Sequence, residues 1–346
     1  MDSNSVTKNA INSFCKSLFG IIGLALGVII VLVGLSLLTS NQSDTPHTTT
    51  LRVLADDEWK IGRFSPDAPT ILKINIAGVI GLDHLRKEEI FQQLIESQDG
   101  DLKPGQVKGI IIAINTPGGT ADDSEAIYHL IKEYKKRYKV PVVAFIEGLC
   151  ASGGTFIACS ADKIYSTEDS LIGHVGVLLS PPFFNFSKFM DKLGIESKTF
   201  FAGKDKDDMN PFRPWRAGEG QNFERLVSFM YDRFRGIVAE NRPKLTVEVL
   251  TEEGAQIYPA PEAETLGYID QRISSIDALL KEFATELGIY EDYQFVQLER
   301  HDFFEDLFGA KATALFGGNK ELSIRIPGDI HPDLHGKPLY LYHPQE

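Results

Sequence analysis

The chain has few cysteines and few positive charges for its size. Only three of its 346 residues are cysteine, too few for the disulfide framework that stabilises small secreted domains. Its 35 lysines and arginines are outnumbered by 48 aspartates and glutamates, which gives a net charge of −13. Such a surface repels polyanions, so nucleic acid is excluded as a partner. With 43% apolar residues, the composition is otherwise that of a globular protein.

Charge is absent altogether from one stretch near the N-terminus. No charged residue occurs between Ser17 and Ser43, and Leu18–Leu38 is a run of 21 mostly apolar residues, long enough to cross a bilayer as a helix. A signal-peptide core is shorter and is followed by small residues at a cleavage site. We therefore predict an uncleaved transmembrane anchor over 17–40, with a cleaved signal peptide as the alternative.

The basic residues around this run predict its orientation. Lys8 and Lys16 precede the run, whereas the first lysine or arginine after it is Arg52. By the positive-inside rule, residues 1–16 lie in the cytoplasm and the rest of the chain lies outside. The polar segment 41–68 is then a linker.

The remainder of the chain predicts an α/β domain over 69–290, followed by a less regular C-terminal extension over 291–346. Aliphatic runs at 70–80, 107–115 and 140–146 are typical of strands, and the central run suits a parallel strand that is buried on both faces. A helix with a capping box at Thr120 separates the last two. Strand and helix in alternation predict parallel pairing with right-handed crossovers.

A serine surrounded by small residues follows one of these strands. The segment Gly148–Gly154 comes between the run at 141–146 and an apolar helical segment ending near Ala161. The first N–H groups of a helix lack partners and can stabilise an oxyanion, while small neighbours let a substrate backbone approach. Ser152 is therefore the candidate nucleophile, and the alternative is a serine that only caps a helix. Cys150 is the next candidate, but no nearby cation favours its thiolate.

The base that would activate Ser152 is less evident from the residues. Of the eight histidines, only His84, His129 and His174 fall inside the predicted domain, and the first two lie in charged, surface-like segments. Lysine is an alternative base in nucleophilic catalysis. Lys204 and Lys206 lie in one segment, which read alone is a solvated charged loop.

Together these residues resemble the signal peptide peptidase A family of serine proteases. Three motifs in order carry the resemblance, with a closing element that follows them: Asn115-Thr116-Pro117-Gly118-Gly119, Ala151-Ser152-Gly153-Gly154, Gly203-x-x-Lys206-Asp207 with Pro211, and Leu266-Gly267-Tyr268-Ile269-Asp270. The resemblance implies a ClpP/crotonase-like fold, a spiral of β-β-α units, here preceded by one transmembrane helix.

The resemblance also implies roles for single residues. Ser152 matches the nucleophile and Lys206 the general base, with Lys204 as runner-up. The N–H of Gly153, with that of Gly118 or Gly119, would form the oxyanion hole. We expect Lys206 to face the site and its acidic neighbours, Asp205, Asp207 and Asp208, to face solvent, as alternation in an extended segment would place them.

His174 departs from the family pattern. It stands where the family usually has a serine that hydrogen-bonds to the catalytic lysine, so we assign it a supporting role. A neutral imidazole would accept a hydrogen bond from the lysine amine, whereas a protonated one would repel it. A ring turned away from the site is the third alternative.

The function implied is a membrane-anchored endopeptidase that uses a Ser–Lys dyad and needs no cofactor or metal. Its substrates would be hydrophobic peptides, the remnants of signal peptides, at the outer face of a bacterial cytoplasmic membrane. The family also implies a homo-oligomeric ring, often with serine and lysine from adjacent subunits, and an interface role for the amphipathic helix around Met230 and Phe234. The alternatives are a catalytically silent scaffold that binds membrane peptides and an acyl-CoA enzyme of the crotonase type.

Overall fold

The computed structural model describes residues 48–82, 85–179, 182–301 and 338–341, together with Gly23 and Gly27. The predicted cytoplasmic segment 1–16 lies outside the described residues, as does the predicted anchor 17–40 apart from those two glycines. Within the described ranges, no helix combines the length and the apolarity that a membrane crossing needs. The compact unit described below comprises Thr49–Glu299 and the C-terminal strand.

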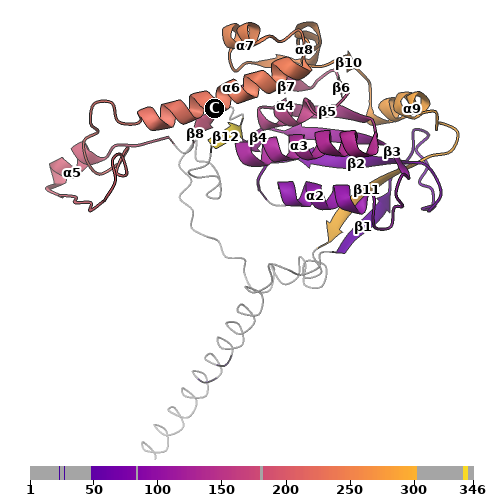
Figure 1. The fold of residues 1–346 in the computed structure, drawn as a ribbon, viewed down its shortest axis with the longest axis horizontal. Helices are drawn as coiled ribbons and strands as arrows, with labels where there is room; N and C mark the ends of the chain where they lie inside the picture. Colours follow the sequence, from indigo (N-terminus) through magenta and orange to yellow (C-terminus); the bar gives the residue numbers. More distant parts are fainter. Residues whose placement is uncertain are drawn as a thin grey trace, which may run out of the picture. The chain divides into compact units, whose positions relative to one another are not determined.

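A mostly parallel sheet forms the centre of this unit (Figure 1). Its main path follows the order β1-β11-β2-β3-β5-β6-β10, and two further strands, β7 and β9, extend it beyond the end of β6. The strands are β1 (Thr48–Val53), β2 (Thr70–Ala77), β3 (Val107–Thr116), β5 (Val142–Ala151), β6 (Lys163–Ser166), β7 (Leu171–Gly173), β9 (Ile257–Pro259), β10 (Gln271–Arg272) and β11 (Gln294–His301). The parallel arrangement of β2, β3, β5 and β6 confirms the α/β prediction.

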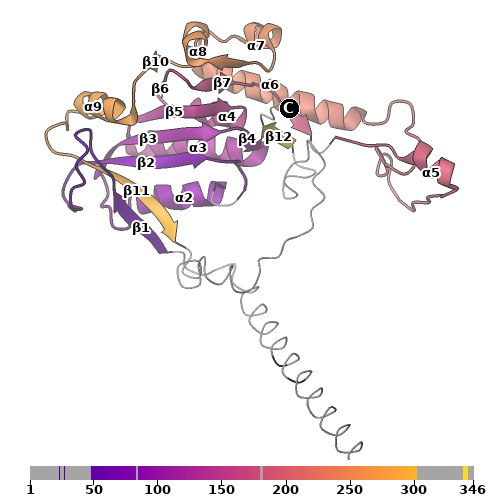
Figure 2. The same ribbon diagram turned by 180° about the vertical axis from the view of Figure 1, so that it is seen from behind.

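The aliphatic runs form buried strands because helices cover both faces of the sheet. On β3, Ile110 and Ile112 pack into one apolar cluster, while Ile111 between them packs into the other. The first cluster includes side chains of α2 (Lys87–Glu96), α3 (Ala121–Tyr138), α4 (Gly153–Ala158) and α6 (Gln221–Asn241). The second includes α9 (Ile276–Glu286), seen on the opposite side in Figure 2. The Thr120 side chain accepts the Asp123 N–H and caps α3, as its capping box predicts.

The folded unit is larger than the sequence suggested. Strand β1 lies in the segment 41–68, which was predicted to be a linker, and β11 lies in the predicted extension 291–346. Residues 294–297 pair in parallel with residues 70–73 of β2, so β11 is an inner strand of the sheet. The predicted boundaries at 69 and 290 therefore fall inside one folded unit.

A second, three-stranded sheet lies beside the first. Its order is β4-β12-β8, with β4 at Gly118–Thr120, β8 at Leu178–Leu179 and β12 at Pro338–Leu341. The remaining helices are α5 (Ser187–Leu193), α7 (Val247–Glu253) and α8 (Ala260–Leu266). We refer to residues 182–220, which include α5 and lead into α6, as the arm, because Figures 1 and 2 show α5 standing away from the main sheet.

Candidate active site

Ser152 lies at the junction between β5 and α4, where the sequence predicted it. Its backbone has φ 55° and ψ −111°, a conformation that non-glycine residues rarely adopt. The turn is held by the Ser152 N–H, which donates to the Gly173 carbonyl at 3.0 Å, and by the Ser152 carbonyl, which accepts the Phe156 N–H. Such strain persists only where the surrounding structure fixes it, and it is concentrated at functional sites. The Ser152 side chain accepts no capping hydrogen bond from a backbone N–H of α4, so its conformation is not that of a simple N-cap.

A glycine at position 154 lets the turn at Ser152 pack against the end of β3. Both Gly153 and Gly154 are buried. A Cβ on Gly154 would lie 2.6 Å from Cγ2 of Thr116, so no larger residue fits without movement. Gly153 is the first residue of α4, where backbone N–H groups have no partner within the helix. This position suits the predicted oxyanion donor.

The second glycine turn, Gly118-Gly119, follows β3 and contacts the segment after β2. Gly118 has φ 98°, and its N–H donates to Thr116 Oγ1 at 3.0 Å. Its carbonyl accepts the Ile80 N–H at 2.9 Å, and the Ile80 carbonyl accepts the Thr120 N–H. An oxyanion at Gly118 would have to replace Thr116 Oγ1 as the acceptor.

Gly119 lies so close to the backbone of Ile80 that we expect this position to tolerate no side chain. A Cβ on Gly119 would lie 1.9 Å from the Ile80 carbonyl oxygen, which is backbone and cannot rotate away. We expect Gly119→Ala to lower the unfolding free energy by ~1–3 kcal/mol, the usual cost of overpacking, and to reduce peptide hydrolysis by displacing the turn. Thermal unfolding and kcat/KM measure the two effects. The control is Gly236→Ala, which has nothing within 4 Å of its Cβ. Equal melting temperatures for the two variants would show that the turn accepts the added methyl group and would contradict this prediction.

Cys150, the alternative nucleophile, lies in an environment that makes its thiol unreactive. Its thiol is fully buried on β5, and burial raises its pKa to about 12. A thiolate is therefore not formed near neutral pH. Its sulfur lies 3.9 Å from Thr155 Oγ1, so it packs as a small core residue. Cys150 and Cys159 are both free.

His174 lies in the segment that is hydrogen-bonded to the backbone of Ser152. It directly follows Gly173, whose carbonyl accepts the Ser152 N–H, and its own N–H donates to the Gln256 carbonyl at 2.6 Å. Its backbone has φ 60°. Partial burial lowers the pKa of its imidazole, so the ring is neutral near pH 7. This environment therefore disfavours the protonated imidazole, which was one of the three alternatives for His174.

Lys204 and Lys206 lie on the arm, and their side chains are exposed. The segment around them consists of turns, with φ 63° at Asp205, so the extended alternation predicted for it is wrong. Asp207 also does not face solvent, because Arg213 and Asn210 bond to its carboxylate and lower its pKa.

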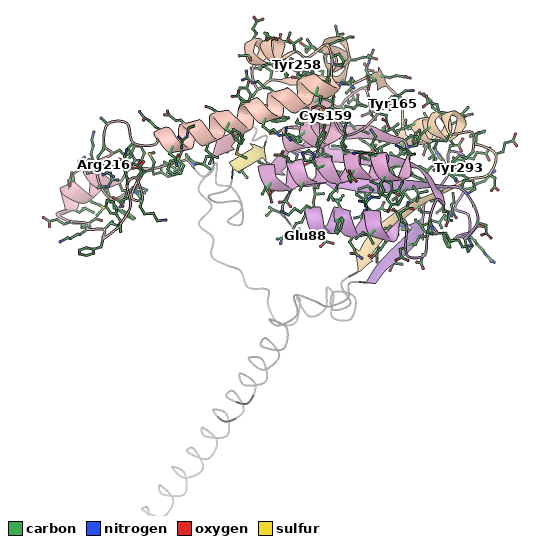
Figure 3. The ribbon with its side chains drawn as sticks, viewed as in Figure 1. Glu88, Cys159, Tyr165, Arg216, Tyr258 and Tyr293 are labelled. Atoms are coloured by element: carbon green, nitrogen blue, oxygen red, sulfur yellow. The ribbon has the colours of Figure 1, made fainter. Side chains whose placement is uncertain are left out.

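Arginine side chains organise this part of the arm. The Arg213 guanidinium bonds to Asp207, at 2.6 Å from Nε, and to Glu219, whose pKa it lowers to about 2. Paired carboxylates of this kind hold a loop in one shape. Figure 3 shows Arg216, which pairs with Asp208 and Glu219, far from Cys159 at the end of α4. The structure thus gathers Ser152, Gly153, Gly118, Gly119 and His174 at the ends of neighbouring strands, and it leaves both lysines on the arm.

The arm has an unusually apolar surface. Its exposed fractions reach 85% for Phe200 and 62% for Phe189. The other large apolar side chains exposed on it are Phe183, Phe184, Phe186, Leu193, Ile195, Phe201, Phe212 and Trp215. Exposed apolar side chains in such number are typical of an interaction surface.

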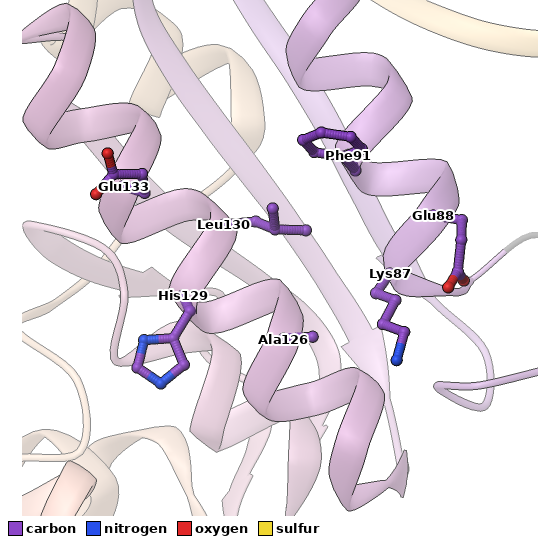
Figure 4. A pocket seen from close by; sticks show the side chains of 7 residues that line it. All are labelled: Lys87, Glu88, Phe91, Ala126, His129, Leu130 and Glu133. Carbon is purple, nitrogen blue, oxygen red and sulfur yellow. The ribbon is translucent and has the colours of Figure 1, made fainter.

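A cavity of about 470 Å³ lies elsewhere, between α2 and α3 (Figure 4). Phe91, Ala126 and Leu130 line it together with polar and charged side chains. It contains none of the residues predicted for catalysis, and it plays no part in the site described above.

Comparison with known proteins identifies the family. A family model described as peptidase family S49 matches residues 134–289, and one described as Clp protease matches residues 82–173. The "Putative protease MJ0651" of Methanocaldococcus jannaschii is 32% identical over 218 residues, which cover 61% of this chain and 69% of that protein. The chain belongs to peptidase family S49. The "Putative signal peptide peptidase SppA" of Enterococcus faecium is 27% identical over 75% of this chain and 78% of its own length. The chloroplastic serine protease SPPA of Arabidopsis thaliana is 30% identical over 52% of this chain and 26% of its own length.

This S49 chain is therefore a serine peptidase related to signal peptide peptidase A, as its motifs predicted. The ClpP-like α/β part of the fold prediction is confirmed as well. Because the chain belongs to a peptidase family, the alternative function of an acyl-CoA enzyme on the same fold is rejected.

Proposed function

We propose that this S49 peptidase is a membrane-anchored endopeptidase in which Ser152 is the nucleophile and Lys206, from a neighbouring copy of the chain, is the general base. The observation that carries the proposal is the strained turn at Ser152, which lies beside the Gly118-Gly119 turn at the ends of two adjacent parallel strands. In parallel sheets, active sites collect at this end of the strands.

The chemistry follows from these positions. Lys206 takes the proton from Ser152 Oγ, which bonds to the carbonyl carbon of the scissile peptide. The resulting oxyanion is stabilised by the N–H groups of Gly153 and of Gly118 or Gly119. Collapse of this intermediate releases the amine, which takes up the proton, and leaves an acyl-enzyme. Water, deprotonated by Lys206, then releases the second product and restores Ser152.

The placement of the lysine supports the role of a second copy. A lysine acts as a base only when it is neutral, and free lysine titrates near 10.4, ~3.4 units above neutral pH. An exposed amine is therefore unsuited to the task, whereas contact with another subunit would bury it and favour the neutral form. The apolar surface of the arm suits such a contact, and neutral His174 would accept a hydrogen bond from the amine.

The substrate class rests on the sequence and the relatives. The predicted anchor at 17–40 would hold the site close to peptides that remain in the membrane and would raise their effective concentration. We propose signal-peptide remnants and other hydrophobic peptides as substrates, cleaved at the outer face of a bacterial cytoplasmic membrane. The alternative of a catalytically silent scaffold predicts the same fold without hydrolysis.

Mixed oligomers test the shared site. Ser152→Ala and Lys206→Ala chains, each inactive alone, are co-expressed with different tags and purified through both tags. If each site takes its serine and its lysine from different copies, random mixing leaves about one quarter of the sites intact, so hydrolysis returns to about that fraction of the parent's. A Ser152→Ala chain co-expressed with Ser152→Ala/Lys206→Ala is the matched control and should stay inactive. Mixed oligomers that form and remain inactive would contradict a dyad shared between subunits.

A further inference from the structure

One buried threonine lies between the two glycine turns of the candidate active site. Thr116 is the last residue of β3, and it lies opposite Cys150 near the end of the neighbouring strand β5 (Figure 1). Its side chain is fully buried. Its methyl group faces Gly154, since a Cβ on that glycine would lie 2.6 Å from Cγ2 of Thr116. Thr116 therefore packs directly against the segment that carries Ser152.

The hydroxyl of Thr116 joins two backbone segments. A hydroxyl has one proton to donate, and that of Thr116 is donated to the Gly78 carbonyl, just after β2. The same oxygen accepts the Gly118 N–H at 3.0 Å. Gly118 has φ 98°, which lies outside the strand conformations, so its backbone direction is not set by the sheet. The Thr116 hydroxyl thus ties the glycine turn after β3 to the end of β2.

This bond affects the two N–H groups that were considered for the oxyanion hole in different ways. The Gly118 N–H is engaged with Thr116. The Gly118 carbonyl accepts the Ile80 N–H at 2.9 Å, and in a trans peptide the carbonyl and the following N–H point in opposite directions. The Gly119 N–H therefore points away from Ile80. Of the two glycines, Gly119 can donate to an oxyanion without breaking the bond to Thr116.

We infer that Thr116 is a positioning residue, whose hydroxyl holds Gly118 so that the Gly119 N–H keeps the direction in which it stabilises the oxyanion. This rests on the proposed function at Ser152. Oxyanion donors are effective because they are oriented before the reaction begins. Loss of the hydroxyl removes the partner of a buried N–H and of a buried carbonyl, and such groups turn toward other partners. The rate of the chemical step then falls, while the binding of substrate does not change.

Thr116→Val tests the hydroxyl, because valine keeps the shape of threonine. We expect kcat to fall ~10- to 100-fold, less than the loss on deleting a whole oxyanion donor, and KM to stay within about twofold of the parent's. Thr70→Val is the matched control. Thr70 is equally buried, but it begins β2, at the opposite end of the strands from Ser152.

The control also removes a matched set of bonds. The Thr70 hydroxyl donates to the Ala68 carbonyl at 3.1 Å and accepts the Gln294 side-chain N–H at 2.8 Å. Both valine variants should therefore melt at lower temperature, while Thr70→Val keeps the kcat of the parent. A Thr116→Val enzyme with the kcat of Thr70→Val would overturn the inference.

A second pair of variants separates the hydroxyl of Thr116 from its methyl group. Thr116→Ser and Thr116→Ala both lack the methyl group that faces Gly154, and they differ from each other in the hydroxyl. We expect the serine variant to keep kcat within about threefold of the parent's and the alanine variant to fall as far as Thr116→Val. Both should melt at lower temperature because of the cavity. Equal kcat for the two would overturn the inference, even where Thr116→Val does not fold.

Two inhibitors show whether the effect is on the oxyanion. The aldehyde carbon of leucyl-leucyl-leucinal bonds to Ser152 Oγ and places its oxygen where the oxyanion forms, whereas the matching alcohol, leucyl-leucyl-leucinol, has no carbonyl to be attacked. We expect Thr116→Val to raise the inhibition constant of the aldehyde by the factor by which kcat falls and to leave that of the alcohol unchanged. Equal weakening of both would overturn the inference. A parent without hydrolysis would refute the proposed function, and the role of Thr116 with it. An active parent with an equally active Thr116→Val would refute the role of Thr116 alone.

Discussion

Replacing Ser152 by alanine is expected to abolish peptide hydrolysis, with a loss of ~10⁴- to 10⁶-fold in kcat, because the variant has no nucleophile to form the acyl-enzyme. Folding should be almost unaffected. Ser152 has φ 55°, and alanine at that position meets the same backbone strain as serine. The hydroxyl makes one long contact, 3.5 Å to the Gly176 carbonyl.

Ser160→Ala is the matched control for this variant. Ser160 is also fully buried, just beyond the end of α4, but its hydroxyl donates to the Ile157 carbonyl at 2.7 Å. We expect it to lose some stability and to keep its kcat. The measurements are kcat, KM and the melting temperature for both variants. Activity of Ser152→Ala within tenfold of the parent, a loss of only ~1.4 kcal/mol, would refute the assignment.

Lys206→Ala is expected to remove hydrolysis at every pH, by a similar factor, because no other group is assigned to accept the Ser152 proton. Lys204→Ala is the natural control, since it removes the same side chain two residues away on the same exposed turn. We expect its effect to be mild. Circular dichroism and melting temperature show whether either change disturbs the arm, whose shape depends on Arg213 rather than on a lysine.

The outcomes of this pair are distinct. An inactive Lys204→Ala enzyme beside an active Lys206→Ala enzyme would move the base by two residues. Full activity in both would end the Ser–Lys hypothesis and make His174 the leading base, with its lowered pKa as the relevant property. His174→Ser, which restores the usual residue of the family, should then abolish activity; under the Ser–Lys hypothesis it retains activity and shifts the alkaline side of the pH profile.

The features that sequence predicted well are local ones. The aliphatic runs of β3 and β5 are recognisable because both faces of these strands are buried, so that most of their positions are apolar, whereas β2 alternates in part. The position of Ser152 at a strand-to-helix junction was predictable because a strand, a group of small residues and a helix follow each other directly in the chain. The helix after Thr120 was found for the same reason, since its cap precedes its apolar positions.

The features that sequence missed depend on distant residues. Strand β11 pairs with β2 more than 200 residues earlier in the chain, and β12 pairs with the equally distant β4, so neither partner can be read from the neighbouring sequence. The inward turn of Asp207 depends on Arg213, a cation outside the motif that identified the segment. The only signal for β12 was the run Leu339–Leu341, which is too short to distinguish a strand from an irregular tail.

Labelling with a fluorophosphonate probe tests the central claim most directly. Such a probe bonds covalently to the hydroxyl oxygen of an activated serine and ignores serines that lack a base. The purified full-length protein is treated with the probe, and the modified residue is identified by digestion and mass spectrometry, with Ser152→Ala and Lys206→Ala treated in parallel. The account predicts that the parent is modified at Ser152 and that neither variant reacts. Modification at another residue, or a parent that hydrolyses peptides while Ser152 stays unmodified, would contradict it.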